Sequence, residues 1–97
     1  MSEAQLSGEQ VSTPVILVVD DNAQVRKMLS SYLARNNHRV TTAKDGKEGW
    51  DIITDEKCKF DLIFADVKMP VMNGLELLEK IRENEYEVPV IIMTGYA

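Results

Sequence analysis

The chain has 97 residues, 44% of them hydrophobic, which suffices for one small globular domain and no more. Its 16 acidic and 11 basic residues give a net charge of −5, which disfavours a nucleic-acid-binding surface because such surfaces are usually basic. The sequence has no apolar run long enough to span a bilayer and no signal peptide, and its one cysteine, Cys58, cannot form a disulfide within the chain. We therefore expect a soluble, cytoplasmic protein that makes no membrane contact.

The first elements follow a short polar segment. Residues 1–13 have no apolar pattern, which predicts a flexible tail. Residues 15–19 (VILVV) are uninterrupted branched apolar residues, typical of a strand buried on both faces in a parallel sheet. A helix is expected next, with Asp21 or Asn22 as its N-cap. Its apolar residues have the spacing of a helical stripe, and they are Val25, Met28, Leu29, Tyr32 and Leu33.

A second strand and a second helix come next. Residues 38–43 (HRVTTA) favour a short strand, and the following KDG at residues 44–46 is a turn signal. The spacing of apolar residues then predicts a helix over residues 47–54, with Trp50 and Ile53 facing inward.

The remaining elements repeat this alternation. Residues 60–66 (FDLIFAD) predict a third strand, and residues 67–74 (VKMPVMNG) predict a loop. Residues 90–94 (VIIMT) predict a fourth strand. Between them we expect a third helix of about two turns, carrying Leu75, Leu77, Leu78 and Ile81. Strands that alternate with helices imply right-handed crossovers and an α/β fold with a parallel sheet.

Polar side chains stand where the predicted strands end. Asp20 and Asp21 follow the first strand, Asp66 ends the third, and Thr94 ends the fourth. In open α/β sheets, ligands bind outside the carboxyl ends of the strands. If the first and third strands are neighbours, the three carboxylates repel one another, and Mg²⁺ would remove the conflict because it prefers oxygen ligands. Capping of the first helix by Asp20 and Asp21 is the simpler alternative for these two residues alone.

Four stretches of the sequence, in order, resemble the receiver domains of two-component response regulators. They are VVDDN, AKDGKEGW, ADVKMPVMNG and PVIIMTGYA, and the resemblance covers residues 14–97. It implies a flavodoxin-like, doubly wound parallel sheet with strand order 2-1-3-4. It also implies a phosphoacceptor signalling domain, not an enzyme, beyond self-phosphorylation and autodephosphorylation.

The resemblance also assigns roles to individual residues. Asp66 matches the phosphoacceptor. Asp20 and Asp21 match the acidic pair that organises Mg²⁺ together with Asp66, and the backbone carbonyl of Lys68 matches a further metal ligand. Thr94 matches the hydroxyl that contacts the phosphoryl group and takes part in switching.

The glycines and the proline near these residues match the family as well. Pro70 and Gly74 match the residues that shape the loop after the phosphoacceptor, and Gly95 stands where the family has a small residue. The sequence ends after the fourth strand, so residues 14–97 are interpreted as a receiver domain truncated before its fourth helix, fifth strand and fifth helix. The lysine that follows the fifth strand in the family is missing too.

Two functions follow from this interpretation. The first is a phosphorelay receiver that takes a phosphoryl group from a sensor histidine kinase onto Asp66 with Mg²⁺. The alternative is a non-switching interaction module that forms a homo-oligomer through the exposed edge of the fourth strand. One face of the third and fourth strands is also expected to lack a covering helix, which exposes an apolar patch. A phosphatase with an aspartyl nucleophile on the first strand ranks last, because Asn22 and Ala23 stand where its second carboxylate would be expected.

Overall fold

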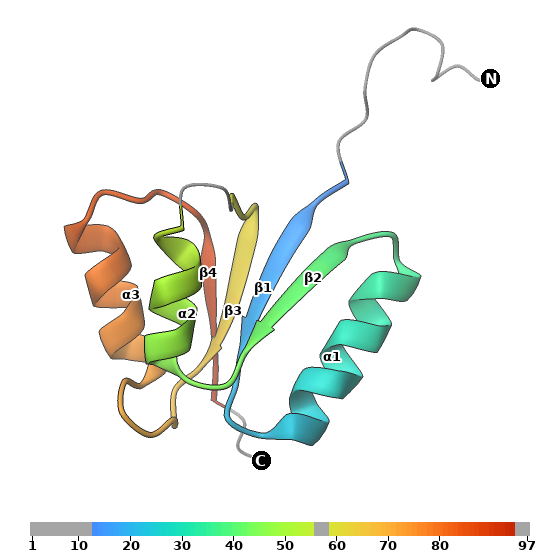
Figure 1. Cartoon of the computed structure of the whole chain (residues 1–97), viewed down its shortest axis with the longest axis horizontal. Coiled ribbons are helices and arrows are strands. Elements are labelled where there is room, and N and C mark those ends of the chain that lie inside the picture. The colour runs from blue at the N-terminus through green and yellow to red at the C-terminus, as the bar shows by residue number, and fades with distance from the viewer. Residues whose placement is uncertain (1–12, 56–58, 95–97) are drawn as a thin grey trace, which may run out of the picture.

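The computed structural model describes residues 13–55 and 59–94, so the predictions for the tail before Thr13, for Cys58 and for Gly95 lie outside the described residues. The described part of the chain forms strands and helices in strict alternation (Figure 1). These elements are β1 (Val15–Val19), α1 (Ala23–Arg35), β2 (Arg39–Ala43), α2 (Gly46–Ile53), β3 (Leu62–Asp66), α3 (Gly74–Glu83) and β4 (Val90–Met93). None of the described helices is long and apolar enough to cross a membrane.

The four strands form one parallel sheet in the order β2-β1-β3-β4, which confirms the predicted fold class and strand order. In the register of the central pair, Val19 lies opposite Ala65. In that of the outer pair, Asp66 lies opposite Met93. All strand arrows point to the same edge of the sheet (Figure 1). The residues at the carboxyl ends of β1, β3 and β4 therefore lie close together at this edge of the sheet.

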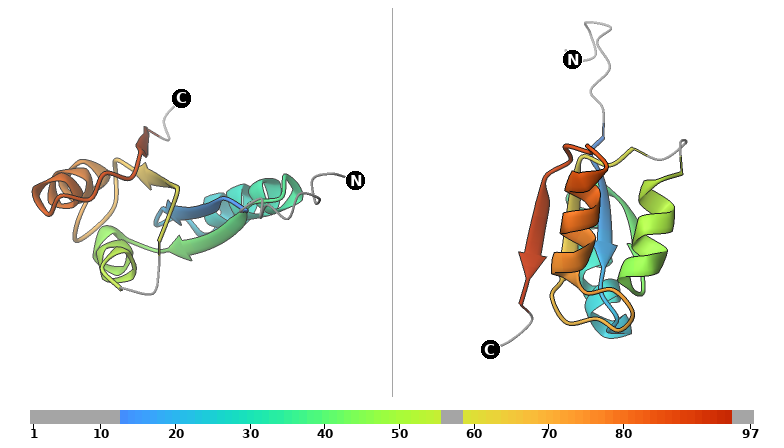
Figure 2. Two further views of the ribbon diagram at one scale, coloured as in Figure 1. Left: turned by 90° about the horizontal axis from the view of Figure 1, so that it is seen from above. Right: turned by 90° about the vertical axis from the view of Figure 1, so that its left-hand side faces the viewer.

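Helices cover the two faces of the sheet unequally. Helix α1 lies on one face, and α2 and α3 lie on the opposite face (Figure 2). The larger core lies under α2 and α3, and its buried residues are Leu17, Val19, Ala43, Ile53, Ile63, Ala65, Leu77 and Ile81. The smaller core lies under α1, and its buried residues are Ile16, Val18 and Leu33. Alternate residues of β1 thus enter different cores, which explains why β1 is apolar at every position.

The apolar stripe predicted on α1 is broader than the face that the helix buries. Leu33 is buried and Leu29 packs beside it, but Met28 and Tyr32 are 62% and 57% exposed. Each exposed residue precedes a packed leucine by one position, which is about 100° around the helix axis. The spacing of apolar residues therefore overestimated how much of α1 contacts the sheet, because the helix packs on only one part of the sheet face.

The helix boundaries differ slightly from the sequence prediction because side-chain caps set them. Asn22, and not Asp21, caps α1, since its side chain accepts hydrogen bonds from the backbone N–H groups of the first turn. Helix α2 begins at Gly46 after the Asp45 cap. Helix α3 has 10 residues, longer than predicted, and it begins with a capping box between Asn73 and Glu76.

One half of the sheet face on the α1 side is not covered by any described helix (Figure 2). On this half, Leu62 and Phe64 of β3 are half-buried. Ile91 of β4, which lies opposite Phe64 in the register, is 45% exposed. We call Leu62, Phe64 and Ile91 the bare face. This agrees with the uncovered apolar face that the sequence predicts for the third and fourth strands.

Candidate functional site

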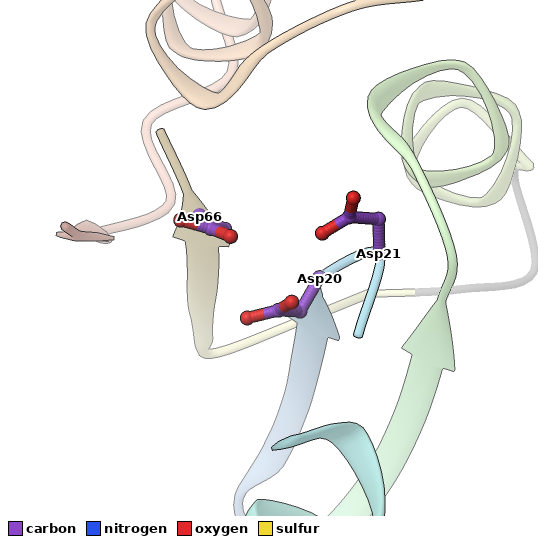
Figure 3. A group of neighbouring side chains, drawn as sticks. All are labelled: Asp20, Asp21 and Asp66. Carbon is purple, nitrogen blue, oxygen red and sulfur yellow. The ribbon is translucent and has the colours of Figure 1, made fainter. Parts of the chain in front are cut away.

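The predicted acidic residues meet at the carboxyl edge of the sheet. Asp20 directly follows β1 and Asp66 is the last residue of the neighbouring strand β3. Asp21 comes next in the chain, and carboxylate oxygens of the three residues all lie within 4.8 Å of one another. Figure 3 shows their side chains around a common space. The pairing of two central strands therefore creates the cluster that the sequence predicts.

Burial makes this cluster electrostatically costly. Asp20 is 4% exposed and Asp66 is 9% exposed, whereas Asp21 lies in solvent. Burial raises the pKa of Asp20 above its ordinary value of 3.8, and the backbone N–H of Asn22 opposes this. The negative charges of Asp66 and Asp21 raise this pKa further, while the charge of Arg26 lowers it. A cation among these carboxylates would remove the repulsion.

Hydrogen bonds hold Asp20 and Asp66 in place. The N–H of Asn22 donates to the carboxylate oxygen Oδ1 of Asp20 at 2.8 Å. Nη1 of Arg26 donates to the backbone oxygen of Asp20 at 2.7 Å. The N–H of Lys68 donates to Asp66 Oδ1 at 3.3 Å. Sequence reasoning missed the contacts of Asn22 and Arg26. The signal for them was the helix that starts directly after the acidic pair, because its cap and first turn must lie beside Asp20.

Lys68 and Thr94 lie at the same hollow as the carboxylates. The hollow has a volume of about 360 Å³, and its lining includes all three aspartates, Lys68 and Thr94. The backbone joins these segments, since the N–H of Val67 donates to the Met93 oxygen at 2.9 Å. Asn22, Val25 and Met93 complete the lining. The structure thus brings together all five residues to which the sequence assigned a role at the site.

Gly74 allows the loop after β3 to fold back on the site. A side chain at Gly74 would clash with the backbone oxygen of Asp66 and would lie 2.8 Å from its carbonyl carbon. The Gly74 N–H donates to the Val67 oxygen at 3.2 Å and closes the loop. This agrees with a role for Gly74 in shaping the loop, because only glycine permits so close a backbone approach.

The donor set fits Mg²⁺. Three carboxylates within reach of one another offer hard oxygen ligands, and one of them is exposed, which gives an ion access from solvent. A second hollow, of about 410 Å³, lies at the opposite end of the strands and is lined largely by apolar residues such as Ile53, Phe60 and Val88. The concentration of charge at the carboxyl edge, and not the size of a hollow, marks the chemical site.

Comparison with known proteins agrees with this geometry. Residues 16–97 match the response regulator receiver domain family. A chemotaxis protein CheY homolog of Campylobacter jejuni is 40% identical over 82 residues, which are 81% of this chain and 62% of that protein. The hybrid signal transduction histidine kinase I of Dictyostelium discoideum is 34% identical over 100 residues, which cover 96% of this chain and 6% of that kinase.

A solved structure extends the comparison to three dimensions. The response regulator protein TrrA of Thermotoga maritima, in complex with Mg²⁺-BeF, superposes with a TM-score of 0.78 at 30% sequence identity. The match covers 88% of this chain and 72% of that one. The chain therefore belongs to the response regulator receiver domain family, a family of phosphoacceptor signalling modules.

Proposed function

We propose that Asp66 accepts a phosphoryl group from a phosphohistidine of a sensor histidine kinase, with Mg²⁺ held by Asp20, Asp21, Asp66 and the backbone carbonyl of Lys68. Receiver domains pair with histidine kinases, and one relative of this chain is itself a hybrid histidine kinase. The observation that carries the proposal is the acidic cluster, whose oxygens lie within 4.8 Å of one another at a hollow that Asp66 lines. The complex of TrrA with Mg²⁺-BeF supports the choice of ion.

In the proposed step, a carboxylate oxygen of Asp66 attacks the phosphorus atom of the phosphohistidine. A P–O bond forms while the P–N bond breaks, and the electron pair of that bond passes to the imidazole nitrogen, which takes up a proton. The products are an acyl phosphate on Asp66 and an unmodified histidine. Bound Mg²⁺ would neutralise the negative charge that gathers on the carboxylates and the phosphoryl oxygens.

The neighbouring groups prepare Asp66 for this step. The Lys68 N–H donates to Oδ1 and holds the carboxylate in one orientation. Thr94 lines the hollow and follows β4, which supports a role for its hydroxyl as a donor to a phosphoryl oxygen. The residue Asp66 is 9% exposed, which supports limited access of water to the acyl phosphate that it would form.

Labelling with a small phosphodonor tests the proposal. Acetyl phosphate with Mg²⁺ should add one phosphoryl group to the wild-type chain, and mass spectrometry of its peptides should locate it on Asp66. Asp66→Asn should abolish the labelling, and removal of Mg²⁺ with EDTA should suppress it. Asp51→Asn is the matched control, because Asp51 is an exposed carboxylate on α2. Labelling of Asp66→Asn at the wild-type level would contradict the proposal.

The bare face supports a second candidate function, a non-switching module that forms a homo-oligomer. Ile91 is 45% exposed on β4, and among the described strands β4 pairs only with β3. Contact between two bare faces would bury Ile91, and pairing of two β4 edges would satisfy backbone groups. Light scattering should then show an oligomer that Ile91→Lys dissociates without loss of Asp66 labelling. A monomer at all concentrations would remove this candidate.

A further inference from the structure

The loop between β3 and α3, residues 67–73, makes two close backbone approaches to neighbouring segments, both near the end that leads into α3. At one end, Gly74 lies against the carbonyl group of Asp66. Near that same end of the loop, Gly46 lies against Met72: a side chain at Gly46 would clash with the Met72 backbone oxygen and would lie 2.7 Å from its Cβ. Gly46 is buried and is the first residue of α2. The start of α2 therefore rests directly on the loop that carries Lys68, as the shared edge in Figure 1 also indicates.

Directly before Met72 the loop contains a strained turn. Val71 has a φ of 71°, and the N–H of Met72 donates to the Pro70 oxygen at 2.7 Å. This is a γ-turn with positive φ, a rare and strained conformation, and a β-branched residue at its centre is an outlier. The Val71 side chain is 78% exposed, so its own packing does not hold the turn. Strain of this kind persists only where the surrounding structure enforces it. The close approaches of Gly46 and Gly74, together with the packing of Met69 and Met72 against the larger core, hold the loop here.

We propose that Gly46 is a positioning residue for the phosphoacceptor site. Because Gly46 has no side chain, the start of α2 can press on Met72 and hold the loop in the strained form that places Lys68 beside Asp66. The inference rests on the proposed function, since it assigns to Gly46 the placement of a proposed metal ligand. The Lys68 N–H to Asp66 Oδ1 bond is already 3.3 Å long, so a small displacement of the loop would break it.

The test compares Gly46→Ala with Gly49→Ala. Both glycines are buried in α2, but a side chain at Gly49 would lie 3.1 Å from Val19 Cγ2 and 3.6 Å from Leu77 Cδ2, in the core and away from the loop. Gly49→Ala therefore controls for destabilisation of the fold. Alanine is the better residue inside a helix, so helix propensity does not account for a loss in either variant.

Two measurements separate positioning from stability. In the first, the dissociation constant of Mg²⁺ is measured by calorimetry at a temperature at which melting curves from the Trp50 fluorescence show both variants to be fully folded. Gly46→Ala should weaken Mg²⁺ binding about tenfold or more, the range found for residues that orient metal ligands. Gly49→Ala should bind Mg²⁺ as the wild type does, even where it melts at a lower temperature. Equal affinity for all three proteins would overturn the proposal.

The second measurement needs no metal. Amide hydrogen exchange of Lys68 and Met72 in the metal-free protein should be faster in Gly46→Ala than in Gly49→Ala, and equal rates would overturn the proposal. If Gly46→Ala does not fold, Met72→Ala replaces it, because this change removes side-chain atoms that pack on Gly46 from the loop side. It should weaken Mg²⁺ binding severalfold, and wild-type affinity would overturn the proposal. If the wild type itself fails to bind Mg²⁺, the proposed function is wrong, and the exchange rates alone decide the role of Gly46.

Discussion

Replacement of Asp20 by asparagine should stabilise the metal-free protein and abolish its stabilisation by Mg²⁺. Asp20 is 4% exposed and its carboxylate lies within 4.8 Å of that of Asp66. Two unit charges at that distance repel by about 3–4 kcal/mol at an effective dielectric constant of about 20. The hydrogen bond from Asn22 and the charge of Arg26 offset part of this repulsion. We therefore expect Asp20→Asn to raise the free energy of unfolding by about 1–2 kcal/mol at neutral pH, which is part of the Coulomb repulsion.

The rise in the free energy of unfolding caused by Asp20→Asn should depend on pH, and it should be larger at neutral pH than at acidic pH. The pKa of Asp20 is raised in the folded protein, so the folded state holds this proton to higher pH than the unfolded chain does. The contribution of Asp20 to stability therefore falls as pH rises from about 3.8 through the raised pKa. Well below pH 3.8, Asp20 is protonated in both states, and the advantage of the asparagine variant over the wild type should disappear.

Urea denaturation followed by the fluorescence of Trp50 provides the assay. Mg²⁺ at 100 times its dissociation constant should stabilise the wild type by about 2.7 kcal/mol and should not stabilise Asp20→Asn. The order of stability should then reverse between metal-free and Mg²⁺-saturated samples. Asp51→Asn, which alters an exposed pair with Lys47, should change stability by less than about 0.5 kcal/mol under both conditions. A metal-free Asp20→Asn that is less stable than the wild type would refute the electrostatic reasoning.

Three further predictions concern the loop after β3, the cap of α3 and the residue that precedes β3. Val71→Gly should raise the free energy of unfolding by about 1 kcal/mol, because the relieved strain exceeds the added entropy of the unfolded chain; a lower urea midpoint would contradict the strained turn. Asn73→Ala should cost about 1–2 kcal/mol through loss of the α3 capping box, and Asn73→Asp should retain most of that stability in thermal melts. Asp61→Ala should cost about 1 kcal/mol, because Asp61 Oδ2 accepts a hydrogen bond of 2.8 Å from the Val15 N–H; an unchanged melting temperature would show that this link between β3 and β1 contributes nothing.

Much of the fold was predictable because the sequence signals are local and strong. Continuous apolar residues mark β1, as expected for a strand that supplies two cores from alternate positions. The regular alternation of strands and helices predicts a parallel sheet. The strand order and the roles of individual residues depended on the resemblance to receiver domains. Convergence of Asp20 and Asp66 then followed, because parallel neighbours end at the same edge.

The details that the sequence did not reveal depend on contacts between distant segments. Spacing identified Met28 and Tyr32 as apolar positions of a helix, but it does not tell how much of the sheet that helix covers. Gly46 in KDG indicates a turn, and no local pattern shows that it touches Met72, which lies in the loop after β3. Arg26 likewise has the appearance of an ordinary surface residue of an amphipathic helix until the fold places it on the Asp20 carbonyl.

Repulsion and backbone strain occur together at the carboxyl edge of the sheet, and this has a consequence for the response of the protein to ligands. The clustered carboxylates and the turn at Val71 both lower the stability of the metal-free protein. The helices around them are well capped, by Asn22 on α1 and by Asn73 on α3. A cation among the carboxylates would relieve the repulsion without relieving the strained turn. The Mg²⁺ response should therefore be lost in Asp20→Asn but retained in Val71→Gly, since the latter alters only the strain and leaves every carboxylate in place.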